Sequence, residues 1–530
     1  PGEPERLAYL DALPSALPYH MLDAVRSSRP SVFLPALGTG EGIRQAIYLG
    51  AGRIDTTEHD PGRRRLLSGD LAGLTDNLLA TPDVHVHPMA ARAFTAHIRQ
   101  PFHLVQIEPG GPGTAGLQAL SSTRDLTLEA FDEYLDLLAP GGLLSLSHPL
   151  QAPPRAVPRL ILTAIRAMES RGWDPAQRLV VIRAWRTATL AVKNGALTPA
   201  EIEAARDFSG DRGFDLVYLP GLVRDDANRY NLLPDPLLFD TVQALLGQER
   251  EDFVGQYKFD LTPVTDNSPF AYHGIRWATL LELWRSPGSA SAAQLEWAFV
   301  ILLVTLAQAA VLSILLILVP TLVAGARAGI TDGMLPTRGK VALYFGAVGL
   351  AFLYVEIAFI HSLQRLLQDP VFAVSAVLAS FLTFAGLGSR LAPSVAERMQ
   401  RMTRWSRPWL IFIGIGIASI APLAILPWLI DWTADWPLWT KFALSILLVA
   451  PLALLMGMPF PLGLAHVAAS APHRLPLAWA VNGCLSVIGA IAAEITILAA
   501  GFTGAVTVGV ILYLVAASVM PRAVEESGLP

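Results

Sequence analysis

The sequence predicts an α/β domain built on a doubly wound, mostly parallel sheet, followed by an all-α domain of membrane-spanning helices. Two observations predict the first domain. A strand, a glycine loop, a helix and a second strand occupy residues 31–60, and β and α segments alternate after them. A third observation predicts the membrane domain: long apolar runs fill the chain beyond residue 294. The 530 residues are 52% hydrophobic and 16% charged, with a mean hydropathy of +0.44. This composition is too apolar for a soluble globular protein.

The distribution of charge along the chain sets the expected domain boundaries. Charged and apolar residues are mixed up to about residue 291, and apolar runs dominate after it. We expect an α/β domain at 1–275, a linker at 276–294, a membrane domain at 295–520 and a C-terminal tail at 521–530.

Net charge and cysteine content exclude some classes of protein. A net charge of −5 gives no reason to expect nucleic acid as a partner. The single cysteine, Cys484, lies in an apolar run and cannot support a disulfide framework. The sequence begins Pro1-Gly2-Glu3-Pro4, with neither an initiator methionine nor a secretory signal. We therefore expect a processed product or a fragment of a longer chain.

The glycine loop is the first candidate binding element. An apolar strand is predicted at 31–37, a helix at 41–49 and a second strand at 54–58, with three glycines at the turn: Gly38, Gly40 and Gly42. Such a loop lets backbone N–H groups and a helix N-terminus approach a nucleotide. Glu58 ends the second strand, where an acid can hold ribose hydroxyls. Because residue 43 is isoleucine, the G-x-G-x-G spacing favours adenosylmethionine-type ligands over NAD.

The α/β pattern continues beyond this loop. Strands are predicted at 84–87, 103–108, 143–147, 179–185 and 187–192, and helices at 90–99, 126–138 and 157–171. Thr198, Pro199 and Glu201 have the spacing of a capping box with proline at the first helical position, so a further helix begins there.

Seven membrane spans are predicted, each from an apolar run of about 20 residues. They are 295–319, 341–361, 371–391, 409–430, 438–469, 477–500 and 506–520. The fifth run is long for one span and contains Gly457-Met458-Pro459-Phe460-Pro461, which predicts a kinked or broken helix.

Polar residues inside the predicted spans are a second group of candidates. Glu356 and Glu494 lie within apolar runs, where a charge is costly unless it is paired or neutral. They serve either the passage of an ion or substrate or a polar contact between helices. His361 and His466 lie nearer the ends of their spans. Four tryptophans surround one short loop and predict an aromatic belt: Trp428, Trp432, Trp436 and Trp439.

Basic residues cluster in alternate loops between the predicted spans. The crowded loops carry Arg327, Arg338, Lys340, Arg390, Arg398, Arg401, Arg404, Arg407, Arg474 and Arg522. By the positive-inside rule these loops are cytoplasmic, in the inner (plasma) membrane of a cell. With seven spans, the α/β domain then lies on the periplasmic or outer side.

Several motifs resemble the spermidine synthase-like proteins in which an aminopropyltransferase domain is fused to a membrane domain. LGTGEG resembles the family's GGGDGG loop, which implies that Glu41 meets the amino group of the ligand. TTEHDP is similar to the VELDP-type segment and implies that Glu58 holds the ribose. Tyr19 and His20 resemble the start of the family's substrate-binding Tyr-His-Glu, although Met21 stands third.

The membrane half resembles the same fused proteins. The matching segments are EIAFIHSLQRLLQDPVFAVSAVLASFLTFAGLGSRLA, MGMPFPLGLAHVA and LPLAWAVNGCLSVIGA. The resemblance therefore covers nearly the whole chain. It implies a Rossmann-like methyltransferase/spermidine synthase fold followed by a multi-span membrane domain.

The sequence departs from the family at two positions that carry chemistry. The family's D-S-T-D-P loop matches Glu108 to Pro112, so Glu108 keeps the first acid while Gly111 replaces the second, proton-accepting one. The family's D-G-R-x-F segment matches Ala90 to Phe94, and Ala90 replaces the acid that binds the adenine amino group. Aminopropyl transfer needs a carboxylate to deprotonate the attacking amine, and glycine cannot do this.

We therefore expect a catalytically impaired spermidine synthase-like protein that acts as a binding or scaffold subunit of a membrane assembly, with membrane proteins and the lipid bilayer as partners. One alternative is an active transferase that uses adenosylmethionine or its decarboxylated form, with Glu108 as the catalytic carboxylate and a small amine as substrate. Another is one half of a carrier-like transporter. No metal site is expected.

Overall fold

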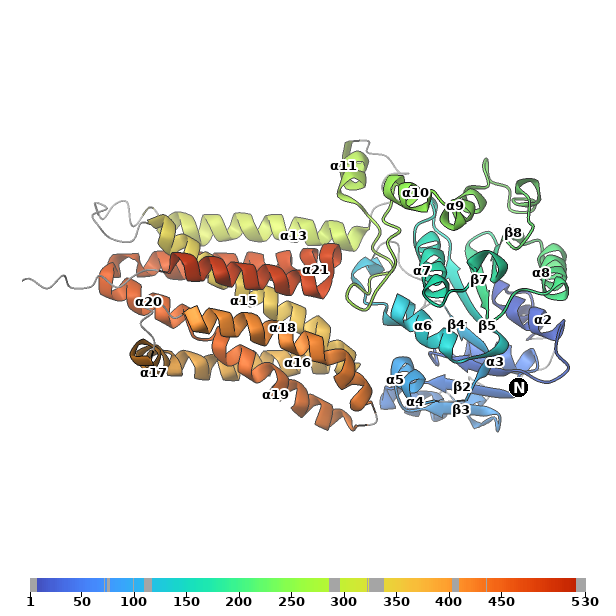
Figure 1. The fold of residues 1–530 in the computed structure, drawn as a ribbon, viewed down its shortest axis with the longest axis horizontal. Helices are drawn as coiled ribbons and strands as arrows, with labels where there is room; N and C mark the ends of the chain where they lie inside the picture. Colours follow the sequence, from blue (N-terminus) through green and yellow to red (C-terminus); the bar gives the residue numbers. More distant parts are fainter. Residues whose placement is uncertain are drawn as a thin grey trace, which may run out of the picture. The chain divides into compact units, whose positions relative to one another are not determined.

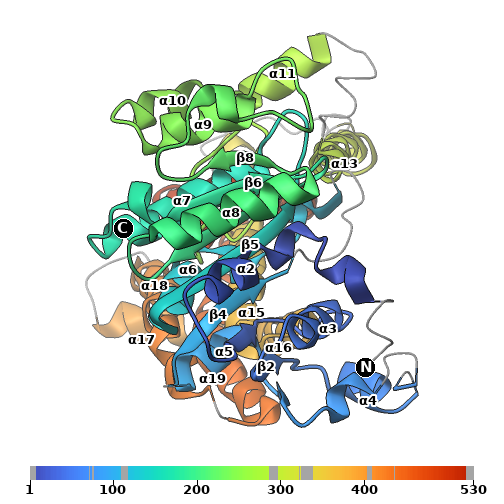
Figure 2. The same ribbon diagram turned by 90° about the vertical axis from the view of Figure 1, so that its right-hand side faces the viewer.

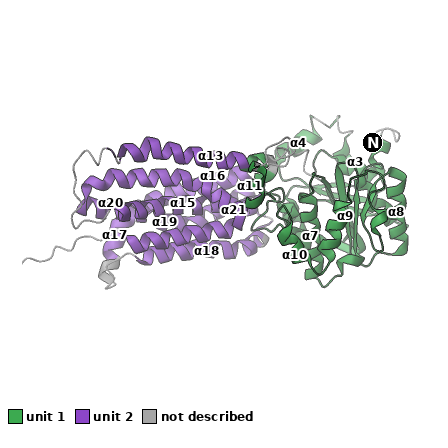
Figure 3. Cartoon of the chain, turned by 90° about the horizontal axis from the view of Figure 1, so that it is seen from above, with its two compact units in different colours: residues 1–299 green, residues 300–530 purple. Residues whose placement is uncertain are grey.

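The computed structural model describes residues 7–70, 72–73, 77–98, 100–108, 117–285, 296–321, 323, 338–402, 409–434 and 436–520. The chain divides into two compact units, Pro1–Phe299 and Val300–Pro530, which Figure 3 shows in different colours. The division lies just inside the segment 295–520 that the sequence assigns to the membrane domain.

The first unit is built on an eight-stranded sheet in the order β3-β2-β1-β4-β5-β7-β6-β8 (Figure 1). The strands are β1 Ser31–Leu34, β2 Arg53–Thr57, β3 Val84–His87, β4 Phe102–Ile107, β5 Leu138–Pro149, β6 Leu179–Arg183, β7 Thr187–Lys193 and β8 Asp215–Tyr218. Strands β1 to β5 pair in parallel, which confirms the predicted class for this half of the sheet.

The other half of the sheet is antiparallel, because β7 pairs antiparallel with β5 and with β6, and β6 pairs antiparallel with β8. Only residues 184–186 connect β6 to β7. A connection of this length can close a hairpin but cannot form the crossover that parallel strands require.

Helices cover both faces of the sheet (Figure 2). They are α2 Leu17–Asp23, α3 Glu41–Tyr48, α4 Pro61–Ser68, α5 Ala91–His97, α6 Leu128–Asp136, α7 Ala156–Ser170, α8 Pro199–Arg212, α9 Leu237–Leu246, α10 Arg250–Gln256 and α11 Trp277–Arg285. The predicted capping box at Thr198 and Glu201 is present at the start of α8. Helix α11 falls in the range 276–294 that the sequence analysis treats as a linker.

Two apolar clusters form the core, one on each face of the sheet. Phe131 of α6 and Leu160 of α7 belong to one cluster, with Ile107 of β4. Tyr19 of α2 and Ile43 of α3 belong to the other, with β4 residue Leu104. Side chains alternate between the two faces of the sheet along β4. This alternation therefore decides on which face Glu108, the residue after the strand, lies.

The second unit is helical. Its elements are α13 Trp297–Ser313, which begins in the first unit, a π-helix at Ile314–Leu318, α15 Arg338–Leu367, α16 Pro370–Ser380, a π-helix at Phe381–Ala385, α17 Gly386–Met402, α18 Trp409–Trp432, α19 Leu438–Met456, α20 Pro459–Ser470 and α21 Leu475–Val519. The break between α19 and α20 lies at the predicted Gly457-Met458-Pro459.

Six described helices are long and apolar enough to cross a membrane, whereas the sequence predicts seven spans. The difference arises in the last helix, which runs through Gly501, a residue with non-helical φ 72° and ψ −179°. The contacts of α15 show that the chain reverses at Gly501. Before it, α21 runs parallel to α15, because Gly346 lies against Leu485 and Leu350 lies against Gly489. After it, α21 runs antiparallel to α15.

The antiparallel half of α21 is defined by two contacts with α15. The ring of His361 stacks on Phe502, with 5.6 Å between the ring centroids, and Val355 packs at Gly509. The last continuous helix therefore consists of two segments that both pack along α15, and the predicted division between 500 and 506 falls at this reversal.

Candidate functional site

The glycine loop connects β1 to α3 in a conformation that only glycine adopts easily. Gly38 has φ +56° and Gly40 has φ +83°, and Gly40 forms the N-cap of α3. A Cβ at Gly40 would approach Leu78 Cδ2 within 2.8 Å. Backbone strain and close packing therefore both require glycine at this position.

Glu108 follows β4, the strand that pairs with β1, and its carboxylate lies against Gly42. The Gly42 backbone N–H donates a hydrogen bond to this carboxylate, and a Cβ at Gly42 would overlap it. Burial and the nearby negative charge of Glu41 raise the pKa of Glu108 to about 7, against the lowering effect of the Gly42 hydrogen bond. The structure thus brings together Gly42, Glu41 and Glu108.

Burial, and to a lesser degree the charge of Glu108, raise the pKa of the Tyr19 hydroxyl well above the ordinary range, so Tyr19 lies within electrostatic reach of the candidate acid. The side chain is 1% exposed, and its hydroxyl has no hydrogen-bond partner among the described residues. His20 is directed elsewhere: its Nε2 bonds Asp11 Oδ1 at 2.6 Å and its ring packs on Phe208. Of the predicted substrate-binding pair, only Tyr19 is placed beside the candidate acid.

Glu58 is buried at the end of β2, where the sequence places it. Its Oε1 accepts a hydrogen bond from the backbone N–H of Asp60 at 3.0 Å, and its Oε2 pairs with Arg63 Nη1 at 3.0 Å. Arg63 also donates from Nη2 to the carbonyl oxygen of Gly38 at 3.1 Å. The arginine therefore connects the expected ribose acid to the glycine loop. The sequence analysis did not identify Arg63, although three consecutive arginines after the second strand could have indicated it.

The residues present fit an adenosyl ligand in part. The loop backbone, Glu41 and Glu58 are arranged around one end of the sheet, and the Glu108 carboxylate fills the space beside Gly42. Ala90 is the N-cap of α5 and has no side-chain hydrogen bond to offer an adenine. Gly111 lies outside the described residues.

Arg92 lies in the segment Ala90 to Phe94, and its side chain holds two acids. Its Nε donates to Glu133 Oε2 at 2.7 Å, and its Nη1 pairs with Asp266 Oδ1 at 3.0 Å. Thr127 Oγ1 also donates to Asp266, at 2.8 Å. This network fastens the turn at Asp266 to α5 and α6, so the segment Thr265 to Phe270 has a structural role.

His148 is a candidate functional residue that the sequence analysis did not identify. It lies one residue before the end of β5 and is 4% exposed. Its Nδ1 bonds the carbonyl oxygen of Pro149 at 2.8 Å, while its Nε2 is buried with no partner among the described residues. Burial lowers the pKa of His148. Its only sequence signal is a histidine next to a proline at a strand end, which is too weak to select it.

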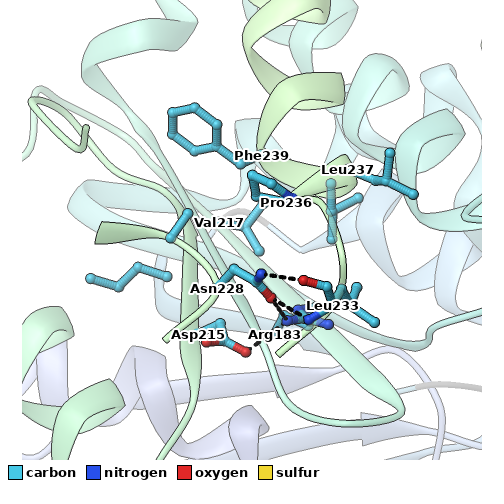
Figure 4. Close-up of a pocket in the computed structure, with 11 residues that line it drawn as sticks. Arg183, Asp215, Val217, Asn228, Leu233, Pro236, Leu237 and Phe239 are labelled. Atoms are coloured by element: carbon cyan, nitrogen blue, oxygen red, sulfur yellow. Dashed lines mark hydrogen bonds and ion pairs between the residues drawn. The ribbon is translucent and has the colours of Figure 1, made fainter. Parts of the chain in front are cut away.

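A pocket, shown in Figure 4, is lined by residues around β6, β8 and the following loop. Arg183 Nη2 bonds Asp215 Oδ2 at 2.8 Å, Asn228 Oδ1 at 3.1 Å and the Asn231 carbonyl oxygen at 2.6 Å. Asp215 also accepts two backbone N–H groups. These polar groups satisfy one another, so the pocket is a structural junction.

The polar residues predicted inside the membrane spans are placed differently from one another. Glu494 Oε1 pairs with His361 Nε2 at 2.9 Å. Glu356 is 8% exposed and makes no hydrogen bond or ion pair with another described residue. His466 Nδ1 bonds the Leu462 carbonyl oxygen within its own helix, at 2.7 Å. No group of three or more His, Cys, Asp or Glu side chains suited to a metal occurs among the described residues.

No protein-family model and no curated protein matches the sequence. The N-terminal α/β part is similar to solved structures of spermidine synthases and methyltransferases. A probable spermidine synthase from Corynebacterium glutamicum is 17% identical over 38% of this chain and 70% of its own, with a TM-score of 0.28. A spermidine synthase in complex with a transition-state analogue is 12% identical over 45% of this chain and 73% of its own, with a TM-score of 0.29. A putative methyltransferase from Escherichia coli is 17% identical over 32% of this chain and 76% of its own, with a TM-score of 0.22.

Proposed function

We propose that this protein is a membrane-anchored binding subunit whose α/β domain holds a cationic adenosyl ligand, either adenosylmethionine or its decarboxylated form, and does not transfer the aminopropyl group at a useful rate. The observation that carries the proposal is the position of Glu108. Its carboxylate lies at the glycine loop beside Glu41, so two acids face the place where a sulfonium and an ammonium group would bind.

The same geometry supports a weakened site. Arg63 pairs with Glu58, so a ribose would have to displace or share that contact. Ala90 offers no side-chain acceptor for an adenine amino group, which costs about 1–3 kcal/mol for a lost buried hydrogen bond. The sequence also has glycine at position 111, where the resemblance implies a general base. Without that base, roughly 10²–10⁴-fold of rate enhancement is at risk.

A second candidate function is an active transferase, and the pKa of about 7 at Glu108 favours it. A carboxylate with this pKa is partly ionised at neutral pH and can accept a proton from an attacking amine. A bound adenosyl cofactor would supply the activated carbon next to its sulfonium. In this case Glu108 acts as the base, and Tyr19 orients the amine.

Charge distribution supports a location for the α/β domain outside the cytoplasm, in the periplasm of a cell with an outer membrane. The loop that follows the first span carries Arg327, Arg338 and Lys340, so it is cytoplasmic by the positive-inside rule. The domain precedes that span and lies on the opposite side. Adenosyl cofactors are made in the cytoplasm, so an outward position also favours binding or scaffolding over turnover.

The test combines binding and turnover on the purified full-length protein. Calorimetry with decarboxylated adenosylmethionine and with adenosylmethionine should detect binding, which Glu58→Gln should abolish and the exposed control Glu203→Gln should leave unchanged. Incubation with decarboxylated adenosylmethionine and a panel of diamines should release no methylthioadenosine. Turnover that Glu108→Gln abolishes would establish the transferase, and absence of binding to either ligand would refute both candidates.

A further inference from the structure

Helix α11, Trp277–Arg285, presents two large apolar side chains to the outside of the first unit (Figure 3). Trp277 is 57% exposed, and Leu281, one turn later, is 48% exposed. Arg285 is also exposed. Because these three residues follow one another at intervals of four, their side chains lie along one face of the helix. A tryptophan and a leucine exposed together in this way indicate a surface that contacts another body.

The opposite face of α11 holds the helix on the α/β domain. Thr279 is 4% exposed and Leu283 is 6% exposed. At about 100° per residue, these two side chains lie on the far side of the helix from Trp277 and Leu281. Thr279 Oγ1 also donates to the carbonyl oxygen of Lys258. Packing and this hydrogen bond therefore fix which face of α11 points outward.

The turn before α11 is fastened to the residue that precedes α13. Glu296 is 1% exposed, and its Oε1 accepts the backbone N–H groups of Gly274 at 2.8 Å and of Ile275 at 3.2 Å. Its Oε2 bonds Nδ1 of His273 at 2.7 Å. All of these residues belong to the first unit. The chain that leads into α11 therefore lies beside the start of α13.

Ring contacts bring Trp277 itself to the first turn of α13. The Trp277 ring packs edge-on against Phe299, with 5.6 Å between the ring centroids, and the His273 ring lies 4.9 Å from the same phenylalanine. Trp297, the first residue of α13, is 44% exposed. The start of α11 and the start of α13 thus share one aromatic cluster.

The length of the helix that begins with α13 sets the expected depth of this cluster. The segment Trp297–Thr321 has 25 residues and is long and apolar enough to cross a membrane. At about 1.5 Å per residue it measures about 37 Å, which exceeds the roughly 30 Å of a hydrocarbon core. Its first turn then lies at the boundary between hydrocarbon and water, where tryptophan is enriched. Trp277 contacts that turn and lies at the same depth.

We propose that the exposed face of α11, formed by Trp277, Leu281 and Arg285, docks on the lipid headgroup region of the membrane leaflet that α13 enters. The indole and the leucine side chain reach the acyl boundary, and the guanidinium meets lipid phosphates. A lipid surface is the occupant that fits, because the face is continuous with the start of a membrane-length apolar helix.

The neighbouring α13 makes such docking effective. A short amphipathic helix binds a membrane weakly on its own, but the attachment at Glu296 and Phe299 gives α11 a high local concentration at the bilayer. The first unit then has two attachments to the membrane, α13 and the face of α11. This docking does not depend on the adenosyl ligand, since no residue of the glycine loop takes part.

The experiment measures the depth of a fluorescent label in vesicles that contain the full-length protein. In a Cys484→Ser background, Leu281→Cys carries an NBD fluorophore on the proposed face, and Glu203→Cys carries the same fluorophore at an exposed position of α8. The vesicles consist of phosphatidylcholine and phosphatidylglycerol, with a nitroxide quencher either on the headgroup or deep in the acyl chain.

The label at position 281 should emit at a shorter wavelength than the label at position 203, and headgroup nitroxide should quench it more than deep nitroxide does. The label at position 203 should be quenched by aqueous iodide and by neither lipid. Adding Trp277→Gln should reduce the lipid quenching at position 281. The matched control is Trp185→Gln, the same change at another exposed tryptophan, which should leave that quenching unchanged.

Thermal unfolding in detergent verifies that every labelled variant is folded. A label at position 281 that iodide quenches as fully as the label at position 203, and that neither lipid quenches, would overturn the proposal. Emission at a shorter wavelength without quenching by either lipid would also overturn it, because a protein surface would then cover the face.

Discussion

The carboxylate of Glu108 lies directly against Gly42, accepts the backbone N–H of that glycine and fills the space that its Cβ would need. The glycine loop and the end of β4 are thereby joined into one acidic site. This relationship depends on the pairing of β1 with β4, because residues 42 and 108 are far apart in the sequence.

The first prediction concerns Gly40. Gly40→Val should destabilise the α/β unit by about 1–3 kcal/mol, because φ is +83° there and the new side chain would meet Leu78. Thermal unfolding in detergent measures the effect. Gly255→Val is the control, since no atom lies within 4 Å of its Cβ position and its φ is ordinary. Unchanged stability in Gly40→Val would contradict the loop geometry.

The second prediction is a pH dependence of stability. The pKa of Glu108 is about 7 in the folded protein and 4.5 in its ordinary state, so the folded state binds more protons between these values. Stability from this group is therefore full below pH 4.5, declines as the pH rises through 7 and stays lower above it. The change is about 3 kcal/mol.

Hydrogen exchange of β4 and β5 peptides, followed from pH 5 to 8, measures this change, after correction for the intrinsic effect of pH on exchange. In Glu108→Gln the decline should vanish, because the amide does not titrate. A wild type whose unfolding free energy does not fall relative to that variant would show that Glu108 is ionised with an ordinary pKa.

The third prediction concerns Arg63. Because this guanidinium pairs with Glu58 and with the Gly38 carbonyl oxygen, it competes with a ribose and repels a cationic ligand. Arg63→Gln should therefore raise the affinity for adenosylmethionine, as measured by calorimetry. Arg65→Gln is the control, since the Arg65 side chain bonds the Pro61 carbonyl oxygen of its own helix and no ligand acid among the described residues. A loss of affinity in Arg63→Gln would mean that the arginine itself holds the ligand.

The fourth prediction tests the network around Arg92. Desolvation by burial lowers the pKa of Arg92, but the hydrogen bonds and charges of Glu133 and Asp266 outweigh this effect and raise the pKa above its ordinary value. Arg92→Met leaves two carboxylates without their partner and should destabilise the α/β unit by about 3–5 kcal/mol. Arg224→Gln breaks an exposed pair with Asp240 and should have no measurable effect. Equal unfolding temperatures for the two variants would refute the network's importance.

The fifth prediction concerns the side of the membrane on which the α/β domain lies. In a Cys484→Ser background, a cysteine at exposed Ser170 should react with an impermeant maleimide in intact cells, and one at exposed Ser394 should not. Membrane disruption should make both react, which controls for accessibility. Labelling of Ser394→Cys alone in intact cells would place the domain in the cytoplasm.

The sequence by itself determined the local structure and the two-part organisation. Apolar periodicity, glycine spacing and capping residues act within a few positions, so they located β1, the loop, α3 and the broken helix at Pro459. The apolar runs located the long apolar helices for the same reason. The sequence also placed Glu58 at the end of β2, because its position relative to the loop is a local signal.

Only the tertiary structure decided which distant groups meet. The antiparallel half of the sheet, the Arg63–Glu58 pair and the reversal of α21 along α15 all depend on packing between separate elements. Sequence periodicity assigns a residue to a face but does not specify its neighbour on that face. Glu494 shows the consequence: its position in an apolar run is visible in the sequence, but its pairing with His361 depends on how two helices pack.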